Sequence, residues 1–438
     1  MSVSRDDQSD AFLNSDTLGD EFFSSIVERK LNIPRDSFKI RLVLLSPAIG
    51  KNENFVSVVY RAKIKIEVLE SHERKCVDVI MKALLSTLEE FKKFSVFPRE
   101  RFLYEDIIKS FEKIWLERTK EVVQFGPACI KVETDPYEII VMDDLKACGY
   151  QMLDRKVGLN AAQTKLALTK LAKFHAASAV RYQKDGVIQD FLDRSVSMVP
   201  EMLAEDSPFG KSFLSIYKGF LESVRSYGDC DFYADKIAKW DHTHLLNSWI
   251  SVAKPMRCGL NVLAHGDFWL NNMMFKSNES NEPEDVLMLD FQGSSWAGPG
   301  LDLHYFITSS VHDDVKITCY DEFIRHYYDQ FTESLVQLKY NQHIPSLDEL
   351  YDDLTDKARM AAGSILIIMF VTKYDCAEEI NMEDFFTSDK KDKEFFDRIY
   401  CNENYKKALK SWLPFMDERG YLDSMLPDDQ NKNLANGN

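Results

Sequence analysis

The sequence lacks the features that mark several common classes of protein. Its longest apolar run, Met360–Thr372, is shorter than the roughly 20 residues that a membrane-spanning helix needs. The polar, acidic start of the chain has no apolar stretch typical of a signal peptide. Eight cysteines are scattered without the paired spacing of a zinc site or a disulfide framework. We therefore expect a soluble protein of the reducing cytoplasm, with no membrane partner.

Positive charge is also in deficit. Lys and Arg number 54 against 71 Asp and Glu, which gives a formal net charge of −17. Because nucleic acids are bound mainly through basic surfaces, we expect no nucleic acid partner. The composition is otherwise that of a globular protein, with 45% hydrophobic and 29% charged residues. Its 438 residues suffice for about two or three domains.

The periodicity of the apolar residues changes near Leu145. Before it, alternation of apolar and polar residues predicts antiparallel strands, with one helical region over 94–115. After it, helical periodicity dominates, as over 160–182, where Asn160 is the expected N-cap. The strands are expected at 38–46, 55–68, 76–85 and within 127–145. The expected segments are an N-terminal extension (1–37, partly disordered, with a helix at 22–31), an N-lobe (38–145), a C-lobe (146–425) and a disordered tail (426–438).

One hairpin carries most of the candidate chemistry. Apolar runs at Met273–Phe275 and Val286–Leu289 flank the polar segment SNESNEPED, which predicts a strand, a turn and a second strand. The loop HGDFWLNN enters this hairpin with Asp267 and Asn272, and Asp290 follows its second strand. We therefore expect these three side chains to lie close together.

The three side chains suit phosphoryl transfer, which needs cations on the phosphate oxygens and a carboxylate that orients the attacking hydroxyl. Asp267 and Asn272 have the D-x-x-x-x-N spacing of a kinase catalytic loop, and Asp290 stands where a D-F-G aspartate would. Oxygen ligands from Asn272 and Asp290, completed by ATP phosphates and water, suit Mg²⁺. The alternative is a polar turn between buried strands, where Asp and Asn are common.

Three N-lobe residues extend this interpretation. Lys82 lies inside an apolar strand, where a kinase fold places the lysine that holds the α- and β-phosphates. Glu100, on the next helix, is the candidate partner that orients Lys82 through an ion pair. The plainer alternatives are a solvent-facing lysine and a solvated helix charge. The turn at Gly50 is a weak candidate phosphate loop, since it lacks G-x-G-x-x-G and a plain hairpin turn fits equally well.

Two residues near the loop are expected to be structural. We interpret His175 as a core histidine and Asp302 as a carboxylate that bonds backbone N–H groups of the catalytic loop. Only about a dozen residues separate Asp290 from Asp302, which leaves little room for the activation segment of a protein kinase. This short separation favours a small-molecule substrate.

The motifs HGDFWLNN, LMLDFQ and GPGLDLHYF, in this order, resemble the ecdysteroid kinase-like family, a branch of the aminoglycoside phosphotransferase and choline kinase superfamily. LAKFHAAS and an N-lobe series are similar to the same family: Gly50, Asn54-Phe55, Ser57 and Tyr60-Arg61. The resemblance spans roughly residues 40 to 380. It implies an α+β, protein-kinase-like two-lobed fold, with a small antiparallel-sheet N-lobe and a large, mostly helical C-lobe.

The resemblance implies a role for each matching position. Asp267 matches the catalytic aspartate, and Asn272 and Asp290 match the Mg²⁺ ligands. Lys82 and Glu100 match the ATP lysine and its partner. The implied hinge, whose backbone would pair with adenine, comprises Met142, Asp143, Asp144 and Leu145. The implied phosphate-side loop includes Gly50, Asn54 and Ser57. The chain departs from the family at residues 51–53, where a second glycine is commoner, and at Asp143, where a glutamate is commoner.

The resemblance further implies an ATP- and Mg²⁺-dependent kinase of a small-molecule alcohol, an ecdysteroid or a similar hydroxylated compound. Two alternatives stay open: a catalytically silent small-molecule or nucleotide-binding protein on the same fold, and a protein kinase. Phe268, Trp269 and Trp296 are candidate apolar walls of the substrate cleft, or simply core residues.

Overall fold

A computed structural model describes the chain in several stretches: 15–48, 57–84, 96–135, 137–186, 207–240, 255–256, 259–374 and 391–426. Gly50, Asn54 and the expected disorder at the two ends of the chain lie outside the described residues. The chain divides into two compact units, Met1–Ile107 with Gly126–Tyr150 and Ile108–Phe125 with Gln151–Asn438. The segment boundaries expected from the sequence stay a prediction.

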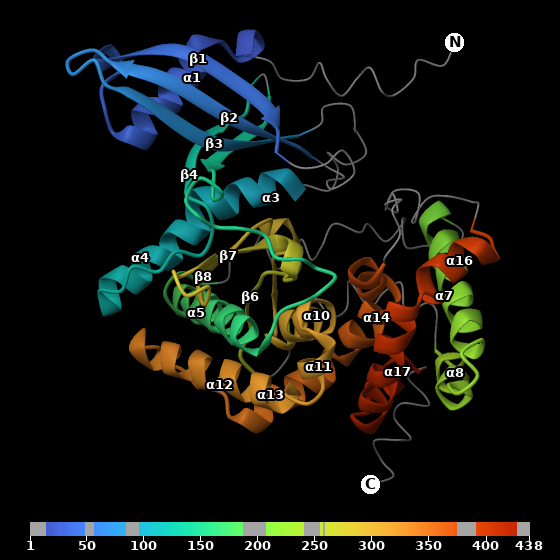
Figure 1. Cartoon of the computed structure of the whole chain (residues 1–438). Coiled ribbons are helices and arrows are strands. Elements are labelled where there is room, and N and C mark those ends of the chain that lie inside the picture. The colour runs from blue at the N-terminus through green and yellow to red at the C-terminus, as the bar shows by residue number, and fades with distance from the viewer. Residues whose placement is uncertain are drawn as a thin grey trace. The chain divides into compact units, whose positions relative to one another are not determined.

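The first unit is built on a five-stranded antiparallel sheet (Figure 1). Every second residue of its second strand is buried between Tyr60 and Ile66, as the alternating pattern predicts. The strands, in the spatial order β1-β2-β3-β5-β4, are β1 (Phe38–Pro47), β2 (Ser57–Val68), β3 (Arg74–Leu84), β4 (Cys129–Glu133) and β5 (Ile139–Asp143). With the largely helical region that follows, this sheet confirms the α+β fold class of a kinase-like, two-lobed protein.

Helix α1 (Ser15–Leu31) packs on one face of the sheet. The helix expected at 22–31 lies within α1, and the helix kinks at Gly19, whose φ of +73° is not helical. Met81 of β3 belongs to the core beneath α1. Since side chains alternate along a strand, Lys82 points to the opposite face of the sheet. Four apolar residues of α1 join that core: Phe22, Phe23, Ile26 and Val27.

The single helix expected over 94–115 is instead three consecutive segments. Helix α3 (Val96–Phe102) is followed by a π-helical turn at Leu103–Ile107 and then by α4 (Ile108–Thr119). A π turn inserts an extra residue into the helical repeat, which a periodicity read at 3.6 residues does not reveal. The boundary between the two units falls at the end of this turn.

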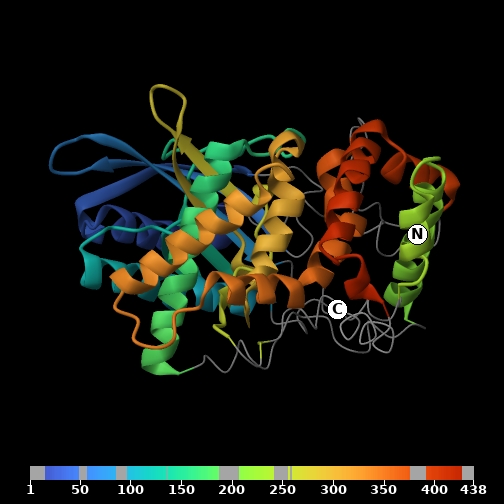
Figure 2. The ribbon, with the colours of Figure 1, turned by 90° about the horizontal axis from the view of Figure 1, so that it is seen from below.

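The second unit is largely helical. Helix α5 (Ala161–Asp185) begins at Asn160, whose side chain accepts the Gln163 N–H while the Gln163 side chain accepts the Asn160 N–H, so the expected N-cap is confirmed. Helix α12 (Tyr320–Gln337) packs along α5, and α10 (Gly300–Ser310) packs along α14 (Ala358–Lys373) (Figure 2). The other described helices are α7 (Pro208–Arg225), α8 (Asp231–Ile237), α11 (Asp313–Lys316), α13 (Leu347–Asp356), α16 (Lys393–Tyr400) and α17 (Glu403–Glu418).

The longest apolar run of the sequence lies within α14. Nearly every residue of this helix is buried, so the run forms core. Among the helices that the structure describes, none is long and apolar enough to span a bilayer.

The hairpin expected beside the candidate catalytic residues is confirmed. Strand β7 (Met273–Ser277) pairs antiparallel with β8 (Pro283–Met288). A further pair that the sequence did not predict joins β6 (Val262–Ala264) to β9 (Ser295–Ala297). Strands of three residues are too short to show an alternating pattern. This second pair brings the start of the catalytic loop beside the segment that follows Asp290.

Candidate active site

The loop of residues 265–272, the candidate catalytic loop, is held against the chain that follows Asp290. Gly266 has φ +77°, a conformation that favours glycine. A Cβ atom on Gly266 would lie 1.9 Å from the carbonyl oxygen of Gly293. The two glycine backbones therefore contact each other directly, next to Asp267.

Asp302 fixes the backbone of the same loop from helix α10. Its Oδ2 accepts the His265 N–H at 2.6 Å, and its Oδ1 accepts the Gly266 N–H at 2.8 Å. Its side chain is fully buried and also contacts Nε2 of His175 at 3.1 Å. His175 is buried as well, and its Nδ1 lies 2.7 Å from the Tyr327 hydroxyl. The structural roles expected for Asp302 and His175 are thereby confirmed.

His265 links the loop to the end of β8. Its Nε2 lies 3.0 Å from the carbonyl oxygen of Leu289, so Nε2 carries the proton, and Nδ1 accepts the Asp267 N–H at 3.4 Å. Burial lowers the pKa of His265, so the ring stays neutral and keeps this hydrogen-bond pattern.

The structure brings Asp267 and Asn272 together. Nδ2 of Asn272 donates to Oδ2 of Asp267 at 2.7 Å and to the Asp267 carbonyl oxygen at 3.0 Å. This contact uses the amide nitrogen of Asn272, so the amide oxygen is the atom suited to a metal ion. The Leu289 N–H donates to the Asn272 carbonyl oxygen at 2.8 Å, which places the end of β8 beside the loop.

Asp290 adds negative charge to this group. Its backbone is left-handed, with φ 58°, which is uncommon outside glycine and asparagine-like residues and is frequent at functional sites. Burial raises the pKa of the Asp267 carboxyl to about 7, and the Asp290 charge raises it further, while hydrogen bonds from Tyr305 and Asn272 oppose the rise. Asp267 and Asp290 are thus close enough to sense each other's charge.

The donor set fits Mg²⁺ when a nucleotide completes it. Asn272 and Asp290 offer an amide and a carboxylate oxygen, and Mg²⁺ is usually bound by one or two such ligands plus phosphates and water. Within the described residues there is no group of three or more His, Cys, Asp or Glu side chains able to hold a metal ion by themselves. A divalent cation would also offset the crowding of negative charge at Asp267 and Asp290.

Lys82 and Glu100 form the ion pair expected in the first unit. The Lys82 Nζ lies 2.6 Å from Oε2 of Glu100, and the two side chains are 8% and 1% exposed. Strand β3 and helix α3 supply one partner each. The roles of this pair and of Ser57, which begins β2 and is buried, toward ATP stay predictions.

The expected hinge, residues 142–145, begins with the last two residues of β5. Asp143 pairs with Lys30 of α1, and Asp144 accepts Nε of Arg61 at 2.5 Å. The Asp143 N–H donates to the carbonyl of residue 128, and the Asp144 and Leu145 carbonyls accept N–H groups further along the chain. Both acidic side chains therefore brace the first unit, and adenine binding by this backbone stays a prediction.

Tyr305 is a site residue that the sequence did not single out. Its hydroxyl donates to Oδ1 of Asp267 at 2.7 Å. It lies on α10 three positions after Asp302, and residues three apart share a helix face. That spacing was the only signal in the sequence, because Asp302 was already expected to face the loop.

Asp353 of α13 anchors the N-terminal end of α10. Its Oδ2 accepts the Gly300 N–H at 2.5 Å. A Cβ atom on Gly298 would lie 1.9 Å from its Oδ1, so that glycine leaves the space the carboxylate occupies. Burial raises the pKa of Asp353 to about 7, against the effects of the Gly300 N–H and of Lys357.

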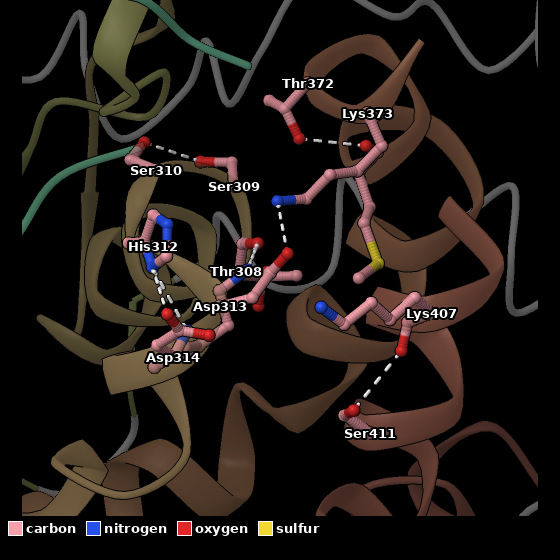
Figure 3. A network of polar contacts seen from close by, with 12 residues as sticks. Thr308, Ser309, Ser310, His312, Asp313, Asp314, Thr372, Lys373, Lys407 and Ser411 are labelled. Atoms are coloured by element: carbon pink, nitrogen blue, oxygen red, sulfur yellow. Dashed lines mark hydrogen bonds and ion pairs between the residues drawn. The ribbon is translucent and has the colours of Figure 1, made fainter. Parts of the chain in front are cut away.

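A polar network anchors the C-terminal end of α10 (Figure 3). Lys316 of α11 donates to the Thr308 carbonyl at 2.8 Å, and Lys373 of α14 pairs with Asp313 at 2.7 Å. Lys316 also pairs with Asp313 at 3.3 Å. Burial lowers the pKa of Lys316 to about 8 despite this carboxylate. These contacts join α10, α11 and α14.

The aromatic residues offered as cleft walls have different surroundings. Phe268 is 1% exposed and packs on Phe306 at 5.0 Å between ring centroids, so it is a core residue. Trp296 is 8% exposed and packs on Tyr182 at 4.8 Å. Trp269 is partly exposed.

A search with sequence profiles of protein families supports these motifs. The profile of the Ecdysteroid kinase-like family matches residues 51–340, which is more than half of the chain. Among curated proteins, none matches the chain. The matched range contains every candidate catalytic and metal-binding residue described above.

Proposed function

This chain belongs to the ecdysteroid kinase-like family, and from that premise we propose that it transfers the terminal phosphoryl group of ATP to a hydroxyl of a small molecule. Family membership implies a kinase-like phosphotransferase. The observation that carries the proposal is the joined pair Asp267 and Asn272, held to α10 and close to the charge of Asp290.

Asp267 acts on the acceptor in this proposal. It accepts a hydrogen bond from the alcohol and orients the hydroxyl oxygen toward the phosphorus atom. As the new O–P bond forms, the bond between the γ-phosphorus and the oxygen that bridges it to the β-phosphate breaks, and ADP leaves. The hydroxyl proton passes to a carboxylate oxygen of Asp267. Because burial raises the pKa of this carboxyl to about 7, it is a more effective base than an ordinary aspartate.

The remaining residues serve the nucleotide. Asn272 and Asp290 would hold Mg²⁺, which neutralises charge on the phosphate oxygens when it is bound. Lys82, oriented by Glu100, binds the α- and β-phosphates. The acceptor we propose is a small hydroxylated compound, with an ecdysteroid as the first candidate. The chain from Asp290 to α10 is occupied by a short turn and β9, which supports a small acceptor over a protein.

The test is phosphorylation of a panel of ecdysteroids, other sterols and plant alcohols by the purified protein with Mg-ATP. Mass spectrometry should detect an alcohol that gains one phosphate. Asp267→Asn should lower turnover by about 100-fold or more, as loss of a general base does. Asp235→Asn, at an acid whose side chain is 66% exposed, is the matched control and should keep full turnover.

Each other result has a definite meaning. A rise in melting temperature with Mg-ATP, with no product from any alcohol, would identify a silent nucleotide-binding protein. Transfer to a generic protein substrate would identify a protein kinase. Full turnover in Asp267→Asn would remove Asp267 from the proposed role.

A further inference from the structure

We propose that Tyr305 is a positioning residue for the transfer: it fixes the carboxylate of Asp267 in the orientation that receives the acceptor hydroxyl. This inference rests on the proposed function. It assigns to α10 a part in the chemistry beyond holding the loop backbone.

The two oxygens of Asp267 are held from opposite partners. Oδ1 accepts the Tyr305 hydroxyl at 2.7 Å, and Oδ2 accepts the amide of Asn272 at 2.7 Å. A carboxylate offers about four acceptor positions, two on each oxygen. The two hydrogen bonds therefore fix the rotation of the carboxylate plane and still leave acceptor positions for the alcohol.

Tyr305 is the donor in its contact with the ionised carboxylate of Asp267. Tyr305 is 3% exposed, and burial together with the neighbouring Asp267 charge raises the pKa of its phenol well above the ordinary value. Tyr305 therefore keeps its proton and donates it to Asp267 while that carboxyl is ionised, which is its state before it accepts the hydroxyl proton. This hydrogen bond favours one orientation of the carboxylate.

Buried tyrosine hydroxyls of this unit have two kinds of partner. Two contact other side chains, Tyr327 with His175 and Tyr320 with Tyr421. Four donate to backbone carbonyls and join helices together. The pairs are Tyr217 with Ile237, Tyr227 with Tyr400, Tyr400 with Leu366, and Tyr405 with Ile365. Tyr305 donates to the side chain at the candidate catalytic position, so its hydrogen bond links α10 to that carboxylate.

Helix α10 is a rigid base for this contact. One turn before Tyr305, Asp302 bonds the backbone of the loop, so a single helix face holds both the loop and its reactive side chain. Asp353 and the network of Lys316 and Lys373 fix the two ends of the helix. A small displacement of the reacting group can cost a large factor in rate, and this anchoring prevents one.

The experiment compares Tyr305→Phe with Tyr405→Phe, a control that also loses one buried hydroxyl. We expect Tyr305→Phe to lower kcat about tenfold to hundredfold, the effect of one hydrogen bond to a charged group, with KM for ATP and alcohol within about twofold. Tyr405→Phe should keep the wild-type kcat. In an Asp267→Ala background, Tyr305→Phe should cause no further loss, because its partner is gone.

Melting temperatures of all variants, measured with and without Mg-ATP, should show whether each variant is folded and binds nucleotide. Wild-type kcat in Tyr305→Phe, or an equal fold-loss in the Asp267→Ala background, would overturn the inference while leaving the proposed function intact. An equal loss in Tyr405→Phe would reduce the effect to general packing and would overturn it too. A wild-type protein that phosphorylates no alcohol would remove the proposed function, and this inference with it.

Discussion

Replacing Gly266 by alanine should destabilise the protein and slow its turnover. Alanine at φ +77° costs about 1–2 kcal/mol, because its Cβ crowds the backbone in the left-handed region. The new Cβ would also meet the Gly293 carbonyl oxygen at 1.9 Å, a contact that forces the two backbones apart. Overpacking of this kind costs about 1–3 kcal/mol more. The total is about 2–5 kcal/mol, and the displacement moves Asp267, which adjoins Gly266.

Gly420 provides a matched control for the backbone cost alone. It has φ +71°, and a Cβ there meets nothing within 4 Å. Urea unfolding should therefore show a larger loss of stability for Gly266→Ala than for Gly420→Ala, by about 1–3 kcal/mol. Only Gly266→Ala should also lower kcat. Equal losses of stability in the two variants would refute the contact between Gly266 and Gly293 as the cause.

Three further predictions concern a buried pair, a buried acid and a helix cap. Lys82→Met should destabilise the protein by about 3–5 kcal/mol, because it leaves the buried Glu100 carboxylate unpaired, and should weaken ATP binding. The double variant with Glu100→Leu should regain stability in urea unfolding but should not regain binding in nucleotide titration. A double variant no more stable than Lys82→Met would contradict this. Burial raises the pKa of Asp353 to about 7, so the stability that its protonated carboxyl contributes is fully present below about pH 4 and is lost as the pH rises to 7. This loss amounts to up to about 4 kcal/mol, and Asp353→Asn should remove it. A variant with the wild-type pH profile of the urea midpoint would contradict the prediction. Asn160→Ala should cost about 1 kcal/mol by removing the capping box of α5, and an unchanged melting temperature would show that the cap is dispensable.

Much of the fold could be predicted because its signals are local. Alternation of apolar residues identified the strands of the first unit and the β7–β8 hairpin, and Asn160 marked the start of α5. The structural role of Asp302 also followed from its place in the first turn of a helix after a short loop. Each of these predictions depends on residues within a few positions of one another.

The remaining features depend on contacts between distant parts of the chain. Strands β6 and β9 pair across the whole catalytic hairpin, and three residues each are too few to give a pattern. The π turn before α4 changes the helical repeat without a distinctive residue. The contact of Tyr305 with Asp267 exists only because α10 lies against the loop. A tyrosine in an apolar helix otherwise indicates nothing more than core.

The anchoring of α10 depends in part on residues that lie outside the segment matching the family. The match to the family stops at residue 340, after the loop, the hairpin and α10. Asp353, which bonds the first residue of α10, lies beyond that limit, and so does Lys373, which pairs with Asp313 of α11. A chain shortened to the family's limits would keep the candidate catalytic residues and the contact of Lys316 with α10, but it would lose the contact of Asp353. We therefore expect such a chain to hold α10, and Tyr305 with it, less firmly than the full chain does.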